Sequence, residues 1–473
     1  MSTQSLFWYD LETTGRDPAR DRILQFAGQR TDLELNPVGP PVNLLCKPPV
    51  DVLPDPEAIA LTGLSVTQCE ARGLGEFDFA KSVLAAFEPA GTCVVGYNSV
   101  RFDDEFLRHL FYRNLMDPYA REWQDKRSRW DLIDTVRLCR ALRPEGIHWP
   151  TDDNGRATNR LESLSTANAL QHTAAHDALS DVEATLAVAR LLRDRQPRLY
   201  DYAFTHRDKH SARQLLAPHN PEPCLHISGM YGADQHFCAI VAPIAEHPTN
   251  PNGILVADLR HAATPFLNLD PDALRARWFA NADTLGSTPR FPVKTVHLNK
   301  CPVLAPLSVL RTSDAARLGL NTAVAAKHLS GWLTDTLRDT VHGVLAAPGF
   351  TPADDPELQL YSGGFFSGKD RAAMQRTVDA AGANVPPARD TAFDDPRLPV
   401  LLERMRARNW PATLSAAEAQ RWQAWVGRVL DEPSVRTVNR ARFVARARQL
   451  KTEQPEVGGL MDELLAHYAP VLN

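Results

Sequence analysis

Two carboxylates stand two positions apart in the first apolar segment of the chain. Asp10 and Glu12 follow the apolar run that begins at Phe7, and the segment ends at Thr14-Gly15. In a strand both acids point to one face, because side chains alternate between the two faces. Like charges on a partly buried face need a cation, and carboxylate oxygens suit Mg²⁺ or Mn²⁺. A strand with a solvated acidic face has the same pattern, so the pair alone leaves both interpretations open.

A third acid, Asp103, stands at the head of a predicted helix. The apolar stripe of that helix consists of Phe106, Leu107, Leu110 and Phe111. Asp103 continues this stripe at helical spacing, which turns its carboxylate inward. Aspartate is also a common N-cap, but Asp104 could supply the cap. We therefore favour a functional role for Asp103.

A fourth acid, Asp181, lies in a predicted helix that runs from His176 to about Arg195. It shares a mostly apolar helical face with Ala178, Thr185, Val188 and Leu192. That face should pack on the sheet and turn Asp181 inward. His176 lies near the start of the helix, where its ring could reach the same site. A lone histidine is more often structural, but its offset from Asp181 favours a functional role.

The elements that must position these acids form an α/β pattern over the first part of the chain. Strands are expected at 7–13, 22–31, 42–47 and 92–97, and helices at 67–72, 77–87, 131–142, 160–170 and 176–195, with a further helix that begins near Asp103 and includes Phe111. A β-rich region follows, with strands at 225–231, 238–242, 254–259 and 292–298 and helices at 271–280 and 324–345. The remaining periodicity is helical, at 370–381, 398–408, 416–430, 435–450 and 459–468. We expect three domains, at 1–196, 197–350 and 351–473.

Composition narrows the class of protein. The 473 residues are 44% hydrophobic and 23% charged, with a net charge of -5, so a nucleic-acid partner would need a local basic groove. The 7 cysteines include no Cys-x-x-Cys pair, which argues against a zinc ribbon or a disulfide framework. The sequence contains no run of about 18 apolar residues, so no membrane-spanning helix is expected. We expect a soluble, non-secreted, cytoplasmic protein.

Aromatic and basic side chains alternate between residues 112 and 130. They are Tyr112, Arg113, Tyr119, Arg121, Trp123, Arg127, Arg129 and Trp130. Stacking rings and cations are what a groove for single-stranded nucleic acid needs, although most such residues in proteins serve the core or the surface. The C-terminal region is also locally basic, at Arg404, Arg406, Arg408, Arg440, Arg442, Arg446, Arg448 and Lys451. Solvated helix faces explain that second group as well as a nucleic-acid track does.

Together the four acids suggest phosphodiester chemistry. Asp10, Glu12, Asp103 and Asp181 come from three separate segments, and each is predicted to face inward. Such a set can hold two Mg²⁺ ions, which would flank a scissile phosphate about 4 Å apart. His176 would accept the proton of the attacking water. Cleavage at a 3′ end would release a 5′-mononucleotide.

The order and spacing of these motifs resemble the DEDD 3′→5′ exonucleases of the histidine subclass. Residues 7–15 resemble their first motif, 98–103 their second and 176–181 their third. Further segments resemble the bacterial exonuclease I family over nearly the full chain: 101–105, 111–114, 117–119, 141–147, 196–199, 299–304 and 364–367. The resemblance implies an RNase H-like mixed-sheet nuclease domain, an SH3-like β-rich domain and a C-terminal helical domain.

The resemblance also implies a function and a set of site residues. It implies processive 3′→5′ digestion of single-stranded DNA in DNA repair, with Mg²⁺ (or Mn²⁺) at Asp10, Glu12, Asp103 and Asp181 and with His176 as base. Substrate contacts are expected at Glu12, Leu61, Thr62, Arg101, Arg108, Tyr119, Trp123 and Arg160. Arg143 and Tyr202 are expected to bind the acidic C-terminal tail of single-stranded DNA-binding protein. We expect a monomer.

Two other functions remain open at this stage. An RNA-trimming or proofreading exonuclease of the same subclass would share the acids, but these enzymes are typically built on the nuclease domain without the two companion domains. A non-catalytic nucleic-acid-binding scaffold would keep the fold and is expected to lose one or more acids. All four acids and His176 are present, so a single-stranded DNA exonuclease is the favoured hypothesis.

Overall fold

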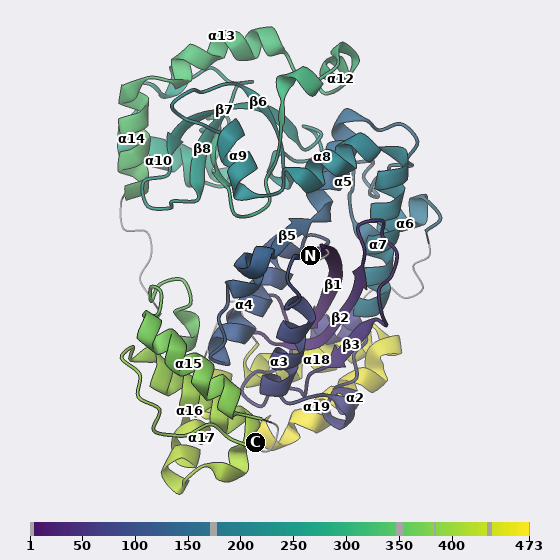
Figure 1. Cartoon of the computed structure of the whole chain (residues 1–473), viewed down its shortest axis with the longest axis vertical. Coiled ribbons are helices and arrows are strands. Elements are labelled where there is room, and N and C mark those ends of the chain that lie inside the picture. The colour runs from purple at the N-terminus through teal and green to yellow at the C-terminus, as the bar shows by residue number, and fades with distance from the viewer. Residues whose placement is uncertain (1–3, 171–176, 347–352, 383–384, 433–437, 473) are drawn as a thin grey trace. The chain divides into compact units, whose positions relative to one another are not determined.

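The computed structural model describes residues 4–170, 177–346, 353–382, 385–432 and 438–472, and its ribbon is drawn in Figure 1. The chain forms two compact units. Unit 1 contains Met1–Ser128, His172–Leu186 and Pro352–Asn473, and unit 2 contains Arg129–Gln171 and Ala187–Thr351. Among the described helices, none has the length and apolar character needed to cross a membrane.

A mixed five-stranded sheet carries the first two acids. Its strand order is β3-β2-β1-β4-β5. The strands are β1 (Ser5–Thr13), β2 (Ile23–Thr31), β3 (Val42–Leu45), β4 (Thr92–Gly96) and β5 (Ser128–Asp131). β1 pairs antiparallel with β2 and parallel with β4, which puts it inside the sheet. Nearly all of its residues are buried, so its apolar side chains fix which way Asp10 and Glu12 point. The predicted α/β mixed sheet is confirmed.

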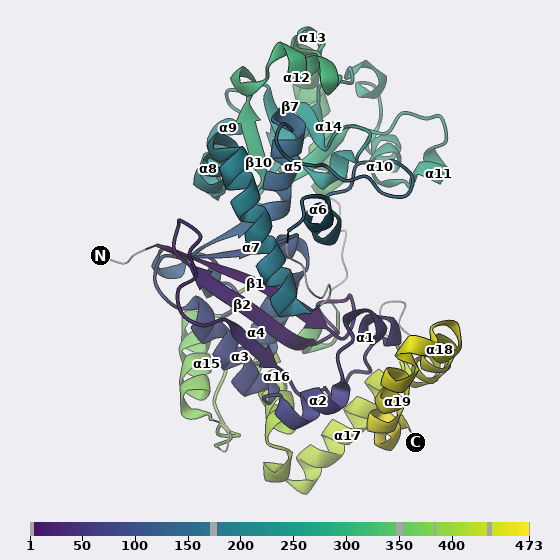
Figure 2. The same ribbon diagram turned by 90° about the vertical axis from the view of Figure 1, so that its right-hand side faces the viewer.

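Helices from both ends of the chain surround this sheet in unit 1. The N-terminal ones are α1 (Pro56–Thr62), α2 (Val66–Arg72), α3 (Glu76–Phe87) and α4 (Asp103–Arg113). The C-terminal ones are α15 (Gly368–Ala380), α16 (Arg397–Asn409), α17 (Ala416–Asp431), α18 (Arg440–Glu453) and α19 (Gly458–Leu472). Figures 1 and 2 both show α16 beside α3, and α19 beside α2. The helix α7 (Ala178–Arg195) begins in unit 1 and continues into unit 2.

The C-terminal helices contribute to two hydrophobic cores in the described part of unit 1. In the first core, Phe7 and Phe26 of the sheet belong to the same cluster as Leu401 and Met405 of α16. In the second core, Leu24, Leu53, Ile59, Val66 and Cys69 cluster with Leu430, Phe443, Ala447, Leu450, Met461, Leu464 and Tyr468. Burial of apolar surface is the main favourable term in folding. The first 128 residues and the last 122 of unit 1 therefore depend on each other for stability, and the boundaries at 196/197 and 350/351 stay predictions.

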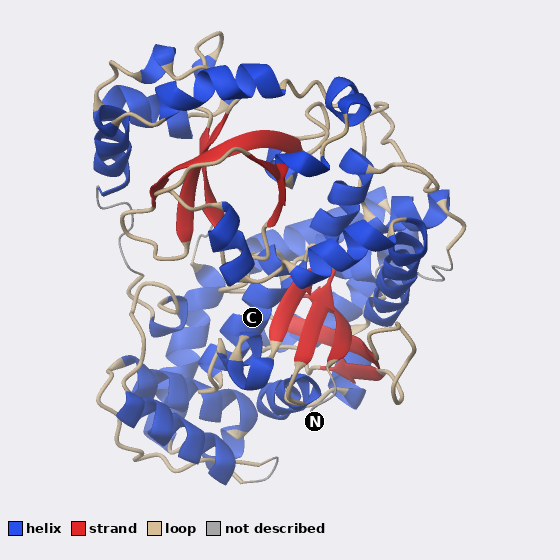
Figure 3. Cartoon of the chain, turned by 45° about the horizontal axis from the view of Figure 1, so that its top comes forward, coloured by secondary structure: helices blue, strands red, loops and turns tan. Residues whose placement is uncertain are grey.

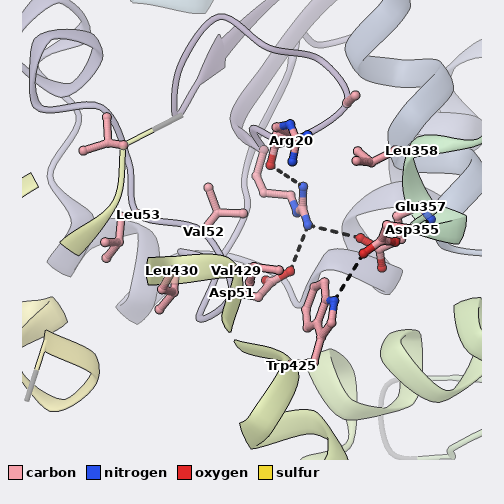
Figure 4. Close-up of a pocket in the computed structure, with 13 residues that line it drawn as sticks. Arg20, Asp51, Val52, Leu53, Asp355, Glu357, Leu358, Trp425, Val429 and Leu430 are labelled. Carbon is pink, nitrogen blue, oxygen red and sulfur yellow. Dashed lines mark hydrogen bonds and ion pairs between the residues drawn. The ribbon is translucent and has the colours of Figure 1, made fainter. Parts of the chain in front are cut away.

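A buried ion network joins the same two parts of the chain. Asp51 accepts hydrogen bonds at 2.8 Å from Arg22, the residue just before β2, and from Arg408 on α16. Arg408 also donates to Glu357 at 2.6 Å. Figure 4 shows the pocket beside this network, where Trp425 donates to Asp355. Burial alone would raise the pKa of Asp51, but the guanidiniums of Arg408 and Arg22 hold it well below its usual range.

The same network corrects one interpretation of the C-terminal arginines. Arg404, Arg406 and Arg408 lie on α16 with side chains that are at most 11% exposed, and each is paired with a carboxylate. For these three residues, neither a solvated face nor a nucleic-acid track is correct. Periodicity did not reveal this, because their partners come from other segments of the chain, namely Asp51, Asp355, Glu357 and Glu418.

Unit 2 is built on a second, antiparallel sheet. Its strand order is β10-β6-β7-β8-β9. The strands are β6 (Cys224–Ile227), β7 (Cys238–Glu246), β8 (Gly253–Asp258), β9 (Val293–His297) and β10 (Val303–Pro306). Figure 3 shows them curling around a common interior. The helices are α5 (Leu132–Leu142), α6 (Leu161–Ala167), α8 (Pro197–Thr205), α9 (Lys209–Leu215), α10 (Pro271–Phe279), α11 (Ala282–Leu285), α12 (Thr312–Arg317), α13 (Thr322–Trp332) and α14 (Asp335–Ala346).

The predicted elements match the observed ones with a few differences. The β-rich and the C-terminal helical regions are confirmed. The helix expected at 324–345 is two helices, α13 and α14, which meet at Leu333. Strands β5 and β10 were not predicted, because each has only four residues and too little alternation to be recognised.

The ion network gives a stability prediction. Arg408→Met removes one of the buried guanidiniums that Asp51 and Glu357 share and leaves Arg22 to balance both carboxylates, so unit 1 should lose about 3 kcal/mol of unfolding free energy. Because the pKa of Asp51 is lowered in the folded protein, this stabilisation is present at neutral pH, begins to be lost as the pH falls below about 4, and is lost fully only when the pH reaches the lowered pKa of the folded state. Urea unfolding of both proteins at pH 7 and pH 2 measures the difference.

The matched control is Arg421→Met on α17, which removes an exposed ion pair with Glu403. Its stability should stay close to that of the wild type, since exposed pairs contribute little. Equal losses in the two variants at pH 7 would show that Arg408 contributes no more than a surface arginine.

Candidate active site

Three acids from distant parts of the chain converge on one point in unit 1. Asp10 and Glu12 come from β1 and Asp181 comes from the first turn of α7. One carboxylate oxygen of each lies within 4.8 Å of the others, which makes this the group among the described residues able to hold a metal ion. Glu12 is buried, and Asp10 and Asp181 are half-buried. Carboxylate oxygens at this spacing match the ligand preference of Mg²⁺ and Mn²⁺.

The fourth acid, Asp103, acts on the same point. It is the first residue of α4 and is 6% exposed. Its negative charge raises the pKa of both Asp10 and Glu12, so it lies near their carboxylates, although it is not one of the three acids within 4.8 Å of one another. Phe102 occupies the N-cap position of α4. The suggestion that Asp104 serves as the cap is wrong, because its carboxylate binds Tyr9 and Arg121.

The electrostatics of the site favour binding of a cation. Burial, followed by repulsion from Asp181 and Asp103, raises the pKa of Glu12 to about 9. The pKa of Asp10 is also raised, first by burial and then by repulsion from Asp103 and Glu12. A divalent ion among the four carboxylates would remove this repulsion, and its binding would release protons.

One acid near the site was not singled out from the sequence. Asp177 precedes α7 and accepts hydrogen bonds from Gln25 at 3.3 Å and from the backbone N–H of Ser180 at 3.2 Å. Its charge also raises the pKa of Glu12. Asp177 therefore fixes the start of α7 and adds to the negative potential. His176, the predicted base, lies outside the described residues.

Apart from the buried Glu12, the predicted substrate contacts of unit 1 are exposed or half-buried, with one exception. Leu61 is 56% exposed on α1, and Thr62 ends that helix before Gly63, which adopts a left-handed φ of 67°. Arg101 is exposed in the 3₁₀ turn η1 (Ser99–Arg101), and Trp123 is 67% exposed.

Arg108 is the exception, because it is buried. Its guanidinium donates to Glu122 at 2.7 Å and to Glu105 at 2.9 Å. It also lies over the ring of Tyr119, 5.6 Å from the centroid. These contacts orient Tyr119 and leave the guanidinium of Arg108 little access to a phosphate.

An exposed aromatic residue near Tyr119 was missed in the sequence. The ring of Phe365 is 88% exposed and lies edge-on to Tyr119, with centroids 6.0 Å apart. Tyr361, 58% exposed, donates to Glu105. Phe365 was part of a resembling segment but carries no pattern of its own. Its closeness to Tyr119 arises from packing of residues 246 positions apart in the sequence.

The remaining predicted contacts belong to unit 2. Arg160 is exposed at the N-cap of α6. Arg143 follows α5 and pairs with Asp314 at 2.7 Å. The hydroxyl of Tyr202 on α8 donates to the carbonyl of Leu304 at 2.9 Å, and its ring stacks on His206. None of these contacts tests the predicted roles.

Comparisons with known proteins match both the site region and the rest of the chain. Family models match at residues 7–189 (Exonuclease), 207–345 (Exonuclease I SH3-like domain) and 354–470 (Exonuclease I C-terminal domain). Exodeoxyribonuclease I of Escherichia coli (strain K12) is 47% identical over 422 residues, covering 89% of this chain and 88% of that protein. Exodeoxyribonuclease I of Haemophilus influenzae is 40% identical, covering 91% of this chain and 92% of its own. The chain belongs to the exonuclease I family.

Solved structures of this family agree with the fold. Exonuclease I from Methylocaldum szegediense matches with a TM-score of 0.93 at 44% identity, over 99% of this chain and 100% of that chain. E. coli exonuclease I in complex with a dA16 oligonucleotide matches with a TM-score of 0.93 at 43% identity, with the same coverage. The resemblance predicted from the sequence is confirmed, with its three kinds of domain. The chain is an exonuclease, and hence a hydrolase.

The raised pKa of Glu12 gives a prediction for the cation-free protein. Because that pKa lies near 9 in the folded state and near 4.5 in the unfolded state, stability should fall as the pH rises between these values. Glu12→Gln removes the charge, so at pH 8 in EDTA it should unfold with a free energy higher by on the order of 2 kcal/mol. Thermal unfolding in EDTA from pH 5 to pH 9 checks this.

Glu34→Gln, at an exposed position after β2, is the control and should follow the wild-type curve. The prediction fails if Glu12→Gln destabilises the protein at pH 8 or keeps the wild-type pH dependence.

Proposed function

We propose that this exonuclease digests single-stranded DNA processively from the 3′ end, releases 5′-mononucleotides and serves DNA repair. The observation that carries the proposal is the convergence of Asp10, Glu12 and Asp181 within 4.8 Å, in a chain that is 47% identical to an exodeoxyribonuclease I. A relative of 43% identity has been solved with a dA16 oligonucleotide, which supports single-stranded DNA as the substrate.

The acids have a defined part in this proposal. Asp10, Glu12, Asp103 and Asp181 would hold two Mg²⁺ ions, for which Mn²⁺ can substitute, and their negative charges fit such ions. When bound, these ions supply Lewis-acid activation of water and neutralise charge on the scissile phosphate. Glu12 also lies where a terminal nucleotide would meet the ions. His176 would take the proton of the attacking water.

The exposed aromatic residues of unit 1 suit the bases of the strand. Trp123 and Phe365 are exposed, and the half-buried ring of Tyr119 lies edge-on to Phe365. Stacking on such rings holds every base equally well, as an enzyme that degrades any sequence requires. Leu61 and Thr62 would contact the terminal nucleotide, and Arg101 and Arg160 would contact phosphates. We assign Arg108 to positioning Tyr119, because its guanidinium is already bound by two carboxylates.

Further proposals concern partners and location. Arg143 and Tyr202 would bind the acidic tail of single-stranded DNA-binding protein. The guanidinium of Arg143 pairs with the carboxylate of Asp314, and a carboxylate of the tail would pair with it in the same way. We further propose a monomer that acts in the cytoplasm. The 7 cysteines are all free and buried, which fits a reducing compartment.

The central test is an exonuclease assay. A 5′-labelled oligodeoxynucleotide with Mg²⁺ should shorten from its 3′ end, and EDTA should stop the reaction. Asp181→Asn should lower the rate by about a thousandfold, because it removes a ligand from the ions that carry the chemistry. Asp194→Asn, on the exposed side of the same helix, should leave the rate unchanged.

Two outcomes would favour the alternatives. Faster cleavage of a labelled RNA than of the same DNA sequence would indicate an RNA-trimming enzyme. Binding of the oligonucleotide without shortening, equal in wild type and Asp181→Asn, would indicate a scaffold.

The aromatic contacts predict an effect on substrate binding. Trp123→Ala should raise KM for a 20-nucleotide strand about tenfold or more, because base stacking contributes about 1–3 kcal/mol per base. The value of kcat should change little, since Trp123 is not among the acids. Leu33→Ala, which removes another exposed apolar side chain from unit 1, is the control. A wild-type KM for Trp123→Ala would remove this residue from the DNA track.

A further inference from the structure

A buried hydrogen-bonded triad lies directly behind the acids. The hydroxyl of Tyr9 donates to Oδ1 of Asp104 at 2.8 Å, and Nη2 of Arg121 donates to the same oxygen at 2.5 Å. Tyr9 is 3% exposed, Asp104 1% and Arg121 0%. Hydrogen bonds to a charged group in such an environment are strong, and leaving one partner unpaired is costly.

The sequence positions of the triad give it a specific place in the site. Tyr9 is the neighbour of Asp10 in β1, and its side chain points to the opposite face of the strand. Asp104 is the neighbour of Asp103 in the first turn of α4. The bond between Tyr9 and Asp104 therefore ties together the two backbone segments that carry Asp10 and Asp103. These segments are 95 residues apart in the chain.

Arg121 brings a third segment into the triad. It lies in the 3₁₀ turn η2 (Ala120–Glu122), between Tyr119 and Trp123. Its guanidinium packs over the ring of Phe87, 5.4 Å from the centroid, and Phe87 also meets the Tyr9 ring edge-on. Its Nε and Nη1 are buried without a hydrogen-bond partner in the described part of the chain. Asp104 is therefore the carboxylate that anchors Arg121, while Arg108 holds Glu122 of the same turn.

We propose that Tyr9, Asp104 and Arg121 are positioning residues that fix the distance between Asp10 and Asp103 and hold the Tyr119–Trp123 turn in register with them. The inference rests on the proposed function, because it assumes that the four acids bind divalent ions. It goes further in naming which non-ligand residues set the affinity for those ions. Outer partners of metal ligands commonly change metal affinity by about 10–100-fold when they are mutated.

Tyr9→Phe is the most selective test. It removes one hydroxyl and keeps the ring that packs on Phe26 and Phe87. The matched control is Tyr112→Phe, in which a buried tyrosine of α4 loses a 2.8 Å bond to the carbonyl of Pro356. Each variant loses one hydrogen bond of a buried tyrosine in the same core, so both should lose thermal stability, and Tyr9→Phe should lose more because its acceptor is a carboxylate.

Calorimetric measurement of the Mn²⁺ affinity, in the absence of DNA, should distinguish the two variants. Tyr9→Phe should weaken Mn²⁺ binding about tenfold, and Tyr112→Phe should bind Mn²⁺ as the wild type does. Arg121→Met should weaken Mn²⁺ binding. It should also raise KM for the oligonucleotide at saturating Mn²⁺, because the turn that carries Tyr119 and Trp123 loses the pair between Arg121 and Asp104. The double variant Asp104→Asn/Arg121→Met, which balances charge and keeps an acceptor for Tyr9, should recover part of the Mn²⁺ affinity.

Asp181→Asn separates failure of this inference from failure of the proposed function. If Asp181→Asn binds Mn²⁺ like the wild type, the acids are not a metal site and the proposed function fails. If Asp181→Asn loses Mn²⁺ while Tyr9→Phe and Tyr112→Phe both keep wild-type affinity, the metal site stands. In that case the triad is merely a structural contact and the inference is overturned.

Discussion

The repulsion among four carboxylates is the constraint on which the rest of unit 1 depends. Asp10, Glu12, Asp103 and Asp181 would separate if their segments were free to move, because burial and like charge both oppose their ionised forms. Packing holds them together. β1 is paired on both sides and buried along nearly its whole length, and α4 is buried at ten of its eleven residues. The folding free energy of this rigid frame keeps the acids ready for a cation.

Much of this site follows from short-range patterns. The spacing of Asp10 and Glu12 on a strand, and the helical stripes that contain Asp103 and Asp181, predicted which way each acid points, and the geometry agrees for Asp10, Glu12 and Asp181. The sheet and most helices also follow from their periodicity, because apolar faces that must be buried repeat every two or about 3.6 residues. The resemblance of the motifs to a known family supplied what periodicity lacks, namely that distant segments meet at one point.

The sequence did not show which residues the charged side chains bind. Asp104 looked like a helix cap and instead binds Tyr9 and Arg121. The arginines of α16 were expected on a solvated helix face or a nucleic-acid track, and instead they pair with Asp51, Asp355, Glu357 and Glu418. Such pairs join residues dozens to hundreds of positions apart, and no local pattern specifies them. Short strands such as β5 were not predicted for a related reason, because the residues that pair with them belong to another strand.

The shared cores of unit 1 have a consequence for how the protein is made. Chains grow from the N-terminus, and β1, α3 and α4 leave the ribosome long before α16 and α19 are synthesised. Until then the residues of the two cores that pack on Leu401, Met405 and Met461 lack these partners, although α3 and α4 already contribute to the first core. The acids on β1 therefore have an incomplete frame until the C-terminal helices pack. A half-made chain contains the residues of the site without all of the packing that positions them.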